Sequence, residues 1–377
     1  MTPPAEIKAV VITKPGTAEI KTVSLPRLRD DYILVRTTVV AVNPADWKHV
    51  DMPVDGNVGA RVGSDYAGVV EQVGGKVTKS FAKGDRICGF AHGSNQTQHE
   101  DGTFAEYIMV KGDVAIKIPD HMSDEQAATL GAGIITVGQS LYQALKLPLP
   151  VSGSSSPPLL SPKSPQILIY GGSTASGLLG IQLARLSGYR VATTCSPSNF
   201  AYVKSLGADA AFDYRSPTVV ADIKAWSRGD GDGDGGDDDD IDDVPLTLAW
   251  DCIATPDSAR ICAGCLSGAR GGTYRALGAV DDAVVKGVNE RVDNGFTVAF
   301  TALGEAFDVG FVVPAVPEDF EFAKMFGELV RELLAEGQVR AVRVDVNCGG
   351  KGLEGTLVGM RELREGRVSG SKLVYTL

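Results

Sequence analysis

The chain has 377 residues, which is more than one hydrophobic core comfortably supports, so two domains are expected. Hydrophobic residues make up 44% of it, and no apolar run approaches the roughly 20 residues that a membrane-spanning helix needs. The net charge of −11 argues against a nucleic-acid partner, and the N-terminus lacks the order of a secretory signal, so we expect no membrane association and a cytoplasmic setting.

The first part of the chain is rich in strand-like runs separated by Gly, Pro and Asp turns. These runs cover residues 8–12, 32–42, 65–73, 86–91 and 104–110. Their spacing predicts a compact, barrel-like β domain.

A helix is predicted next. Ser123 and Gln126 have the spacing of a capping box, and the apolar pattern continues to about residue 145. Residues 147–165 are then rich in Ser and Pro, which is typical of a flexible connector inserted at a surface.

The segment 166–196 reads as strand, glycine turn, helix and strand. Residues 167–170 are a β-type run, and an apolar helical stripe follows the turn. The turn consists of Gly171, Gly172, Ser173, Thr174, Ala175, Ser176 and Gly177. This order predicts a dinucleotide-binding unit with the pyrophosphate at the helix N-terminus, because glycines let the backbone approach the phosphates closely. An ordinary glycine turn in a sheet is the alternative.

The second strand of this unit indicates which dinucleotide binds. A site for NAD usually has Asp or Glu about 20 residues past the glycines, and none stands at the end of the run 190–199. Thr194, Ser196 and Asn199 offer neutral donors there, and Lys204 adds a positive charge. We therefore predict NADPH as the cofactor. Alternatively, the polar strand end only caps the next helix through Ser198 or Asn199.

Residues 229–243 carry nine aspartates and no basic residue, so much of the net charge is local. The segment imitates the start of a calcium-binding loop, but Ile241 stands where a bidentate Glu is needed. We interpret it as a solvated insertion. Cys262 and Cys265 have C-x-x-C spacing without a second pair, so no metal or redox role is predicted.

The C-terminal part alternates helices and strands. A helix over 319–336 that Gly337 closes precedes a strand-like run over 338–346, a helix over 353–365 and a final strand over 372–377. The final strand is expected to rejoin the first domain.

Taken together, several motifs resemble those of a known superfamily. They are Asn43-Pro44-Ala45-Asp46-Trp47, Gly63-Ser64-Asp65-Tyr66-Ala67-Gly68, Lys83-Gly84-Asp85-Arg86-Ile87, Gly102-Thr103-Phe104-Ala105-Glu106-Tyr107, the glycine-turn segment, Leu206-Gly207-Ala208-Asp209 and Gly370-Ser371-Lys372-Leu373-Val374-Tyr375. The ordered set is similar to the zinc-free quinone and enoyl reductase branch of the medium-chain dehydrogenase/reductase superfamily. Within it, residues 170–175 and 195–200 resemble the fungal trans-acting enoyl reductases of highly reducing polyketide synthases.

The resemblance implies an α/β protein with a GroES-like β-rich catalytic domain and a Rossmann domain, which is a doubly wound parallel sheet. The expected limits are residues 1–140 with 310–377 for the first and 141–309 for the second, which carries the inserted loops 147–165 and 229–243.

Two departures from the superfamily pattern concern ligands. Zinc-dependent members have a cysteine where Asn43 stands and Gly-His-Glu where this chain has Gly63-Ser64-Asp65, and a structural zinc would need four cysteines near Cys88. We expect no zinc. Many quinone reductases of the branch also have a lysine at the position of Asn199.

The resemblance also implies site residues. The segment before Lys48 lines the cleft beneath the nicotinamide in this family, so Lys48 is the candidate for polarising the substrate or protonating it; a solvated surface lysine, with water as the proton source, is the alternative. Asn43 is expected to orient ribose or substrate. Thr136 matches a family threonine near the nicotinamide, unless its hydroxyl bonds its own helix backbone. Tyr214 is expected at the adenosine end.

The implied function is an NADPH-dependent enoyl reductase that reduces the α,β-double bond of a polyketide enoyl thioester, in trans with a polyketide synthase that carries the substrate on its acyl carrier. A general zinc-free quinone or alkenal oxidoreductase remains an alternative. A third possibility is a relative that binds NADPH without catalysis.

Overall fold

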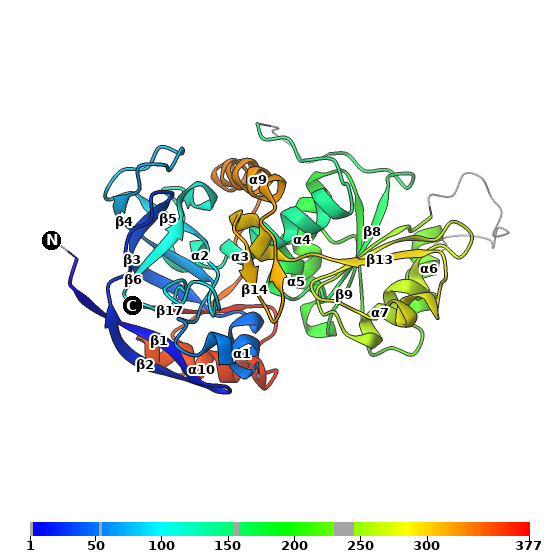
Figure 1. Cartoon of the computed structure of the whole chain (residues 1–377). Coiled ribbons are helices and arrows are strands. Elements are labelled where there is room, and N and C mark those ends of the chain that lie inside the picture. Colours follow the sequence, from blue (N-terminus) through cyan, green and yellow to red (C-terminus); the bar gives the residue numbers. More distant parts are fainter. Residues whose placement is uncertain (1–2, 53–54, 154–157, 230–244) are drawn as a thin grey trace. The chain divides into compact units, whose positions relative to one another are not determined.

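The computed structural model describes residues 3–52, 55–153, 158–229 and 245–377 (Figure 1). The predictions for the calcium-like aspartates and for the middle of the Ser/Pro-rich insertion therefore lie outside the described residues. The chain divides into two compact units. Unit 1 comprises Met1–Ile135 with Ala299–Leu377, and unit 2 comprises Thr136–Val298.

Unit 1 is built on a seven-stranded sheet in which β6 pairs with β3 beside the order β16-β17-β3-β4-β5-β7. Its strands are β3 (Tyr32–Ala41), β4 (Asp65–Val73), β5 (Arg86–Phe90), β6 (Tyr107–Lys111), β7 (Ile116–Lys117), β16 (Val344–Val346) and β17 (Lys372–Thr376). Two antiparallel pairs accompany it: β1 (Glu6–Lys14) with β2 (Thr17–Ser24), and β14 (Phe307–Asp308) with β15 (Val312–Val313). As predicted, the last strand returns to the first domain, because β17 pairs with β3.

Short helices connect these strands, and two longer ones pack on them. The helical segments are α1 (Pro44–Asp51), η1 (Asp55–Asn57), η2 (Gly112–Val114), α2 (Asp124–Ala127), α3 (Gly131–Val137), η5 (Ala299–Leu303), α9 (Pro317–Ala335) and α10 (Gly352–Arg364). Leu353 and Met360 of α10 bury their side chains with Val40 and Tyr375 of the sheet, so the C-terminal part completes a core that the N-terminal strands begin.

Unit 2 has a six-stranded sheet of order β10-β9-β8-β11-β12-β13 in which every pairing is parallel. The strands are β8 (Gln166–Tyr170), β9 (Arg190–Thr194), β10 (Ala210–Phe212), β11 (Leu248–Asp251), β12 (Gly272–Ala276) and β13 (Val292–Phe296). The order reverses between β8 and β11. This is the topology of the predicted Rossmann domain, in which ligands bind at the carboxyl ends of the strands where the order reverses.

Helices cover both faces of that sheet. They are η3 (Gly138–Ala144), α4 (Ala175–Leu186), η4 (Pro197–Asn199), α5 (Phe200–Ser205), α6 (Val219–Arg228), α7 (Pro256–Cys265) and α8 (Asp282–Lys286). Residues of α6, α7 and α8 share one buried cluster with Leu168 and Ala249 of the sheet. Trp250 points to the opposite face, where it meets α4. The alternation follows from the period of two in a strand.

Two local predictions were wrong, and several strands were missed. The expected helix from Ser123 to about residue 145 is interrupted: its capping box forms, with Ser123 and Gln126 bonded at 3.3 Å in both directions, but α2 ends at Ala127. Gly131 then lies against the Gly89 carbonyl, where a Cβ would be 2.0 Å from the oxygen. The strand-like run 338–346 is a strand only over Val344–Val346, and no run was predicted for β2, β7 or the strands from β10 to β15.

Candidate functional site

The predicted glycine turn lies at the carboxyl end of β8, held against β9. Gly171, with φ of +81°, donates its N–H to Thr194 Oγ1 at 3.1 Å, and the Gly172 N–H donates to the Thr194 carbonyl at 2.9 Å. A Cβ on Gly172 would be 1.9 Å from Thr193 Oγ1. Both positions therefore require glycine.

Thr174 caps the helix that follows. Its Oγ1 accepts the Gly177 N–H at 3.0 Å and donates to the Gly171 carbonyl at 2.8 Å. By contrast, the N–H groups of Ser173, Ala175 and Ser176 have no acceptor within the described part of the chain. Free N–H groups at the start of a 12-residue helix suit the negative charge of a phosphate, so the turn fits a dinucleotide.

Helix α4 packs unusually close to the sheet. A Cβ on Gly177 would be 2.4 Å from the Gly171 carbonyl oxygen, and a Cβ on Gly180 would be 2.2 Å from the Trp250 ring. Gly180 was missed at the sequence level, although its spacing of three from Gly177 on an apolar helix was a usable signal. In this fold the later glycine serves close packing between helix and strand.

The five residues predicted for the adenosine end differ in placement. Thr194 is fully buried and holds the turn, as described above. Ser196 is half-buried, and its hydroxyl has no partner among the described residues, whereas Asn199 is buried. Tyr214 is 40% exposed, with its ring 6.3 Å from that of Tyr170.

Lys204 lies elsewhere. The Gly207 N–H donates to its carbonyl at 3.0 Å, and the Asp209 N–H donates to the Val191 carbonyl near the start of β9, which Arg190 begins and Thr194 ends. Five residues of strand separate the two edges of the sheet by on the order of 13 Å. The structure thus brings Ser196 and Tyr214 to the carboxyl edge but leaves Lys204 at the amino edge.

A loop after β11 borders the turn and was not predicted. Asp251 is fully buried: its Oδ2 accepts from Ser258 at 2.6 Å and Tyr274 at 2.8 Å, and its Oδ1 accepts the N–H groups of Ile253 and Ala254. These bonds hold Ala254 at φ of +60°. The adjacent Ile253 side chain is 42% exposed and lies against Gly171, so an apolar surface adjoins the turn.

In unit 1, Asn43 and Asp65 take part in a buried ionic network, at positions where zinc-dependent members of the superfamily that the sequence resembles have Cys and Glu. Asn43 Nδ2 donates to Asp65 Oδ2 at 2.9 Å, the Lys372 ammonium donates to the same oxygen, and the Ala132 N–H donates to Asp65 Oδ1 at 2.5 Å. Asp65 is fully buried and Lys372 is 4% exposed. An amide, a carboxylate and an ammonium do not form a zinc-binding set.

Asp46 adjoins this network. Its Oδ2 accepts the Asn43 N–H at 2.7 Å, which fixes the start of α1, and Ser64 donates to its other oxygen at 3.3 Å. Burial, with a smaller contribution from the charge of Asp65, raises the pKa of Asp46 to about 7.

Lys48 projects from α1 next to an aromatic cluster. Its side chain is exposed, has no ion pair among the described residues, and holds its Nζ 5.9 Å from the Trp47 ring centre. The neighbouring His49 contacts Phe300, which stacks on His92 at 3.7 Å between ring centres. Burial lowers the pKa of His92 to about 3, so this imidazole is uncharged at neutral pH, like the phenyl ring on which it stacks.

Thr136 lies in α3, at the start of unit 2 in the division of the chain. Its hydroxyl has no hydrogen-bond partner in the described ranges, so the alternative in which it bonds its own helix backbone does not occur. The hydroxyl remains able to donate to a ligand.

The C-x-x-C pair lies in the core of unit 2. Cys262 and Cys265 are buried in α7, and burial raises the pKa of Cys265 to about 12. Within the ranges that the structure describes, no group of three or more His, Cys, Asp or Glu side chains could hold a metal ion. Nor does any described helix have the length and apolar character to cross a membrane.

Comparisons with known proteins agree with this architecture. Residues 29–120, in unit 1, match the alcohol dehydrogenase GroES-like domain family. The chain is 42% identical to the trans-enoyl reductase resD of Aspergillus sclerotiorum, over 98% of this chain and 99% of that one. It is 47% identical to the trans-enoyl reductase TOXD of Cochliobolus carbonum, over 80% of this chain and 91% of that one.

The fold is also that of a mycobacterial protein solved in complex with NADPH, with a TM-score of 0.67, 20% identity and coverage of 98% of this chain and 100% of that one. The glycine turn, the GroES-like sheet and these relatives together place the protein. The chain belongs to the trans-enoyl reductase family of oxidoreductases.

Proposed function

We propose that the chain is an NADPH-dependent enoyl reductase that reduces the α,β-double bond of an enoyl thioester carried by a partner polyketide synthase. The observation that carries the proposal is the glycine turn with its free N–H groups, in a chain that is similar over nearly its whole length to proteins named trans-enoyl reductases. The NADPH bound to a protein of the same fold supports the choice of cofactor.

Residues of unit 2 would hold the cofactor. The N–H groups of Ser173, Ala175 and Ser176 are assigned to the pyrophosphate, and Ser196 with Tyr214 to the adenosine end. A carboxylate directly after β9 would repel a 2′-phosphate, and the segment 195–199 contains none.

When bound, the nicotinamide supplies a hydride for the β-carbon of the substrate. The chain must provide stabilisation for the negative charge on the thioester oxygen and a proton for the α-carbon. Lys48 is assigned to these tasks because its ammonium is exposed and unpaired among the described residues. The Thr136 hydroxyl is assigned as a second donor.

Asn43 is assigned a positioning role. Its amide nitrogen is engaged by Asp65 and its backbone N–H by Asp46, so it holds the first turn of α1, the helix that presents Lys48. The bond to Asp65 uses one hydrogen of the amide nitrogen, so its second N–H and its Oδ1 are assigned to orienting ribose or substrate.

The test compares turnover of an acyl-carrier-bound enoyl thioester with that of a simple quinone at equal concentration. Tethering raises the effective concentration, so we expect the carrier-bound substrate to react at least ~10-fold faster. Lys48→Ala should lower kcat by roughly 100-fold and leave the Kd for NADPH within a few-fold. Lys351→Ala, at an exposed lysine of the same unit, is the matched control.

Each other outcome selects a different function. Preference for quinones over every enoyl thioester would indicate a general quinone or alkenal oxidoreductase. Saturable NADPH binding without turnover of either substrate would indicate a binding protein. Full activity of Lys48→Ala would remove only the assignment of that lysine.

A further inference from the structure

At the carboxyl ends of β9 and β10, polar groups from two chain segments lie close together; this region is called the corner of the unit 2 sheet. β9 and β10 are parallel with Thr194 opposite Phe212, and the Cys195 N–H donates to the Phe212 carbonyl at 3.0 Å. The residues that follow β10 therefore leave the sheet beside those that follow β9. This places Tyr214 and its neighbours next to Ser196 at the carboxyl edge, on the same side as the glycine turn.

Arg215 is the one Lys or Arg in the two segments that meet there, residues 194–200 and 212–216. Its guanidinium is oriented by Asp213: Nε donates to Oδ1 at 3.0 Å and Nη2 to Oδ2 at 3.2 Å. The Arg215 side chain is 59% exposed, and its guanidinium carbon lies 5.5 Å from the centre of the Tyr214 ring.

The guanidinium has donors to spare. Of its five N–H bonds, the pair with Asp213 uses two, so Nη1 and one hydrogen of Nη2 remain directed outward in a fixed planar fork. Such a fork matches a phosphate group, and the partnerless hydroxyl of Ser196 lies on the neighbouring segment.

The cation predicted from the sequence does not serve this corner. Lys204 lies near the end of α5, where the Gly207 N–H donates to its carbonyl at 3.0 Å just before the chain enters β10 at its amino end. Asn199 occupies the position at which related reductases have a lysine, and it is buried.

We propose that Arg215 is the specificity-determining residue that binds the 2′-phosphate of NADPH, with Ser196 as a second donor and Asp213 holding the guanidinium in place. The inference rests on the proposed NADPH dependence and adds to it the residue that distinguishes the phosphorylated from the unphosphorylated dinucleotide. It needs no residue of unit 1.

The experiment measures the Kd of the full-length protein for NADPH and for NADH, by nicotinamide fluorescence without substrate. Arg215→Gln should weaken NADPH by roughly 10-fold to 100-fold, because a charge-assisted bond to phosphate is lost, and leave NADH within about 2-fold. Lys204→Gln is the matched control and should change neither value. In the wild type, raising the salt concentration should lower the preference for NADPH, and in Arg215→Gln this salt effect should be nearly absent.

The outcomes separate this inference from the proposed function. If Arg215→Gln weakens NADPH and NADH equally, the arginine supports the adenine or the fold, and the inference is overturned. The inference is also overturned if the wild type prefers NADPH and Arg215→Gln keeps that preference, or if Lys204→Gln abolishes it. In either case another residue sets the preference, and the NADPH dependence stands. A wild type that binds NADPH and NADH equally would overturn the NADPH dependence itself.

Discussion

Asp65 and Lys372 are the buried charges on which the centre of unit 1 depends. They come from β4 and β17, and their contact joins the N-terminal and C-terminal parts of the unit. Asp65 also accepts hydrogen bonds from the Asn43 side chain and the Ala132 backbone N–H, so one carboxylate holds the starts of both α1 and α3. Removing one partner of such a buried pair costs free energy of folding, because the charge that remains is neither paired nor hydrated.

We expect Lys372→Met to lower the free energy of unfolding by about 3–5 kcal/mol, since it leaves the Asp65 carboxylate buried and unpaired. Chemical denaturation measures this, with Lys351→Met as the exposed control. Adding Asp65→Asn to Lys372→Met should restore part of the loss, because the amide carries no charge. A loss in Lys372→Met no larger than in the control would contradict the account.

Asp46 should make stability depend on pH. Its pKa of about 7 in the folded protein lies above the value of about 3.9 in an unfolded chain, so the unfolded chain ionises first as pH rises. The contribution of Asp46 to stability is therefore complete below about pH 4, falls as pH rises to about 7, and is constant above that.

The matching measurement is the unfolding free energy of wild type and Asp46→Asn at pH values from 4 to 8. The wild type should lose stability relative to the variant by a few kcal/mol at most across this range. Asp120→Asn, at an exposed position, controls for the loss of a carboxylate. An unchanged difference across the range would contradict the assigned titration.

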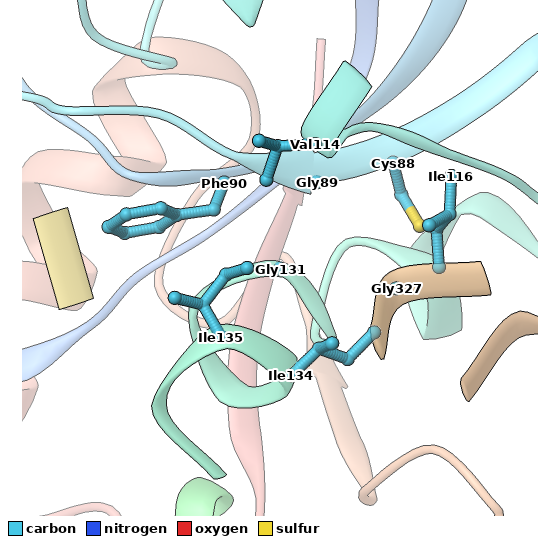
Figure 2. A pocket seen from close by; sticks show the side chains of 9 residues that line it. All are labelled: Cys88, Gly89, Phe90, Val114, Ile116, Gly131, Ile134, Ile135 and Gly327. Carbon is cyan, nitrogen blue, oxygen red and sulfur yellow. The ribbon is translucent and has the colours of Figure 1, made fainter. Parts of the chain in front are cut away.

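At the scale of elements, two helix-interior glycines have opposite surroundings. Gly180 of α4 abuts the buried Trp250 ring, whereas Gly327 of α9 borders a cavity of about 10 Å³. Figure 2 shows this cavity, with Ile116 and Ile134 among its lining side chains. Helix propensity favours Ala over Gly by about 1 kcal/mol at both positions, so packing decides the sign.

We expect Gly180→Ala to destabilise the protein by roughly 1–3 kcal/mol and to weaken NADPH binding, since α4 must move away from the sheet and carry the phosphate-binding turn with it. Calorimetry and cofactor titration measure the two effects. A variant that is as stable as the wild type would show that α4 can shift freely.

Gly327→Ala should instead raise the unfolding free energy by about 0.5–1 kcal/mol. The new Cβ would be 3.2 Å from Ile116 Cγ2, and the adjoining cavity gives that side chain room to shift. The melting temperature measures this, and a decrease would mean that the cavity wall is rigid.

The elements also show where sequence patterns suffice. Most strands of unit 1, the strands β8 and β9 of unit 2 and the helix after the glycine turn were predicted, because alternation and helical periodicity are local properties. The interruption of the helix after Ala127 was not, since it depends on Gly131 meeting Gly89 and on Asp65 bonding Ala132. Likewise, spacing placed Lys204 near Asn199 along the chain but could not reveal that α5 carries it to the opposite edge of the sheet.

For the whole molecule, metal dependence provides the clearest test of the branch assignment. We expect no stoichiometric zinc in the purified protein and full reductase activity after chelation, because Asn43 and Gly63-Ser64-Asp65 replace the zinc ligands and Lys372 and Asn43 both donate to Asp65. Elemental analysis and assay of the chelated enzyme measure this. One zinc per chain, with activity lost on its removal, would refute the assignment.

Unit 1 consists of two chain segments separated by unit 2, and this affects the order in which the nascent chain can fold. Unit 2 lies within one continuous stretch, whereas β3 pairs its Ala41 with Val374 of β17. At ordinary translation rates, tens of seconds separate the synthesis of these two strands. During that interval the nascent N-terminal sheet has an unpaired edge, and Asp65 has no Lys372. The ribosome-bound chain can therefore complete unit 2 first, and the segment that emerges earliest is the last to complete its sheet.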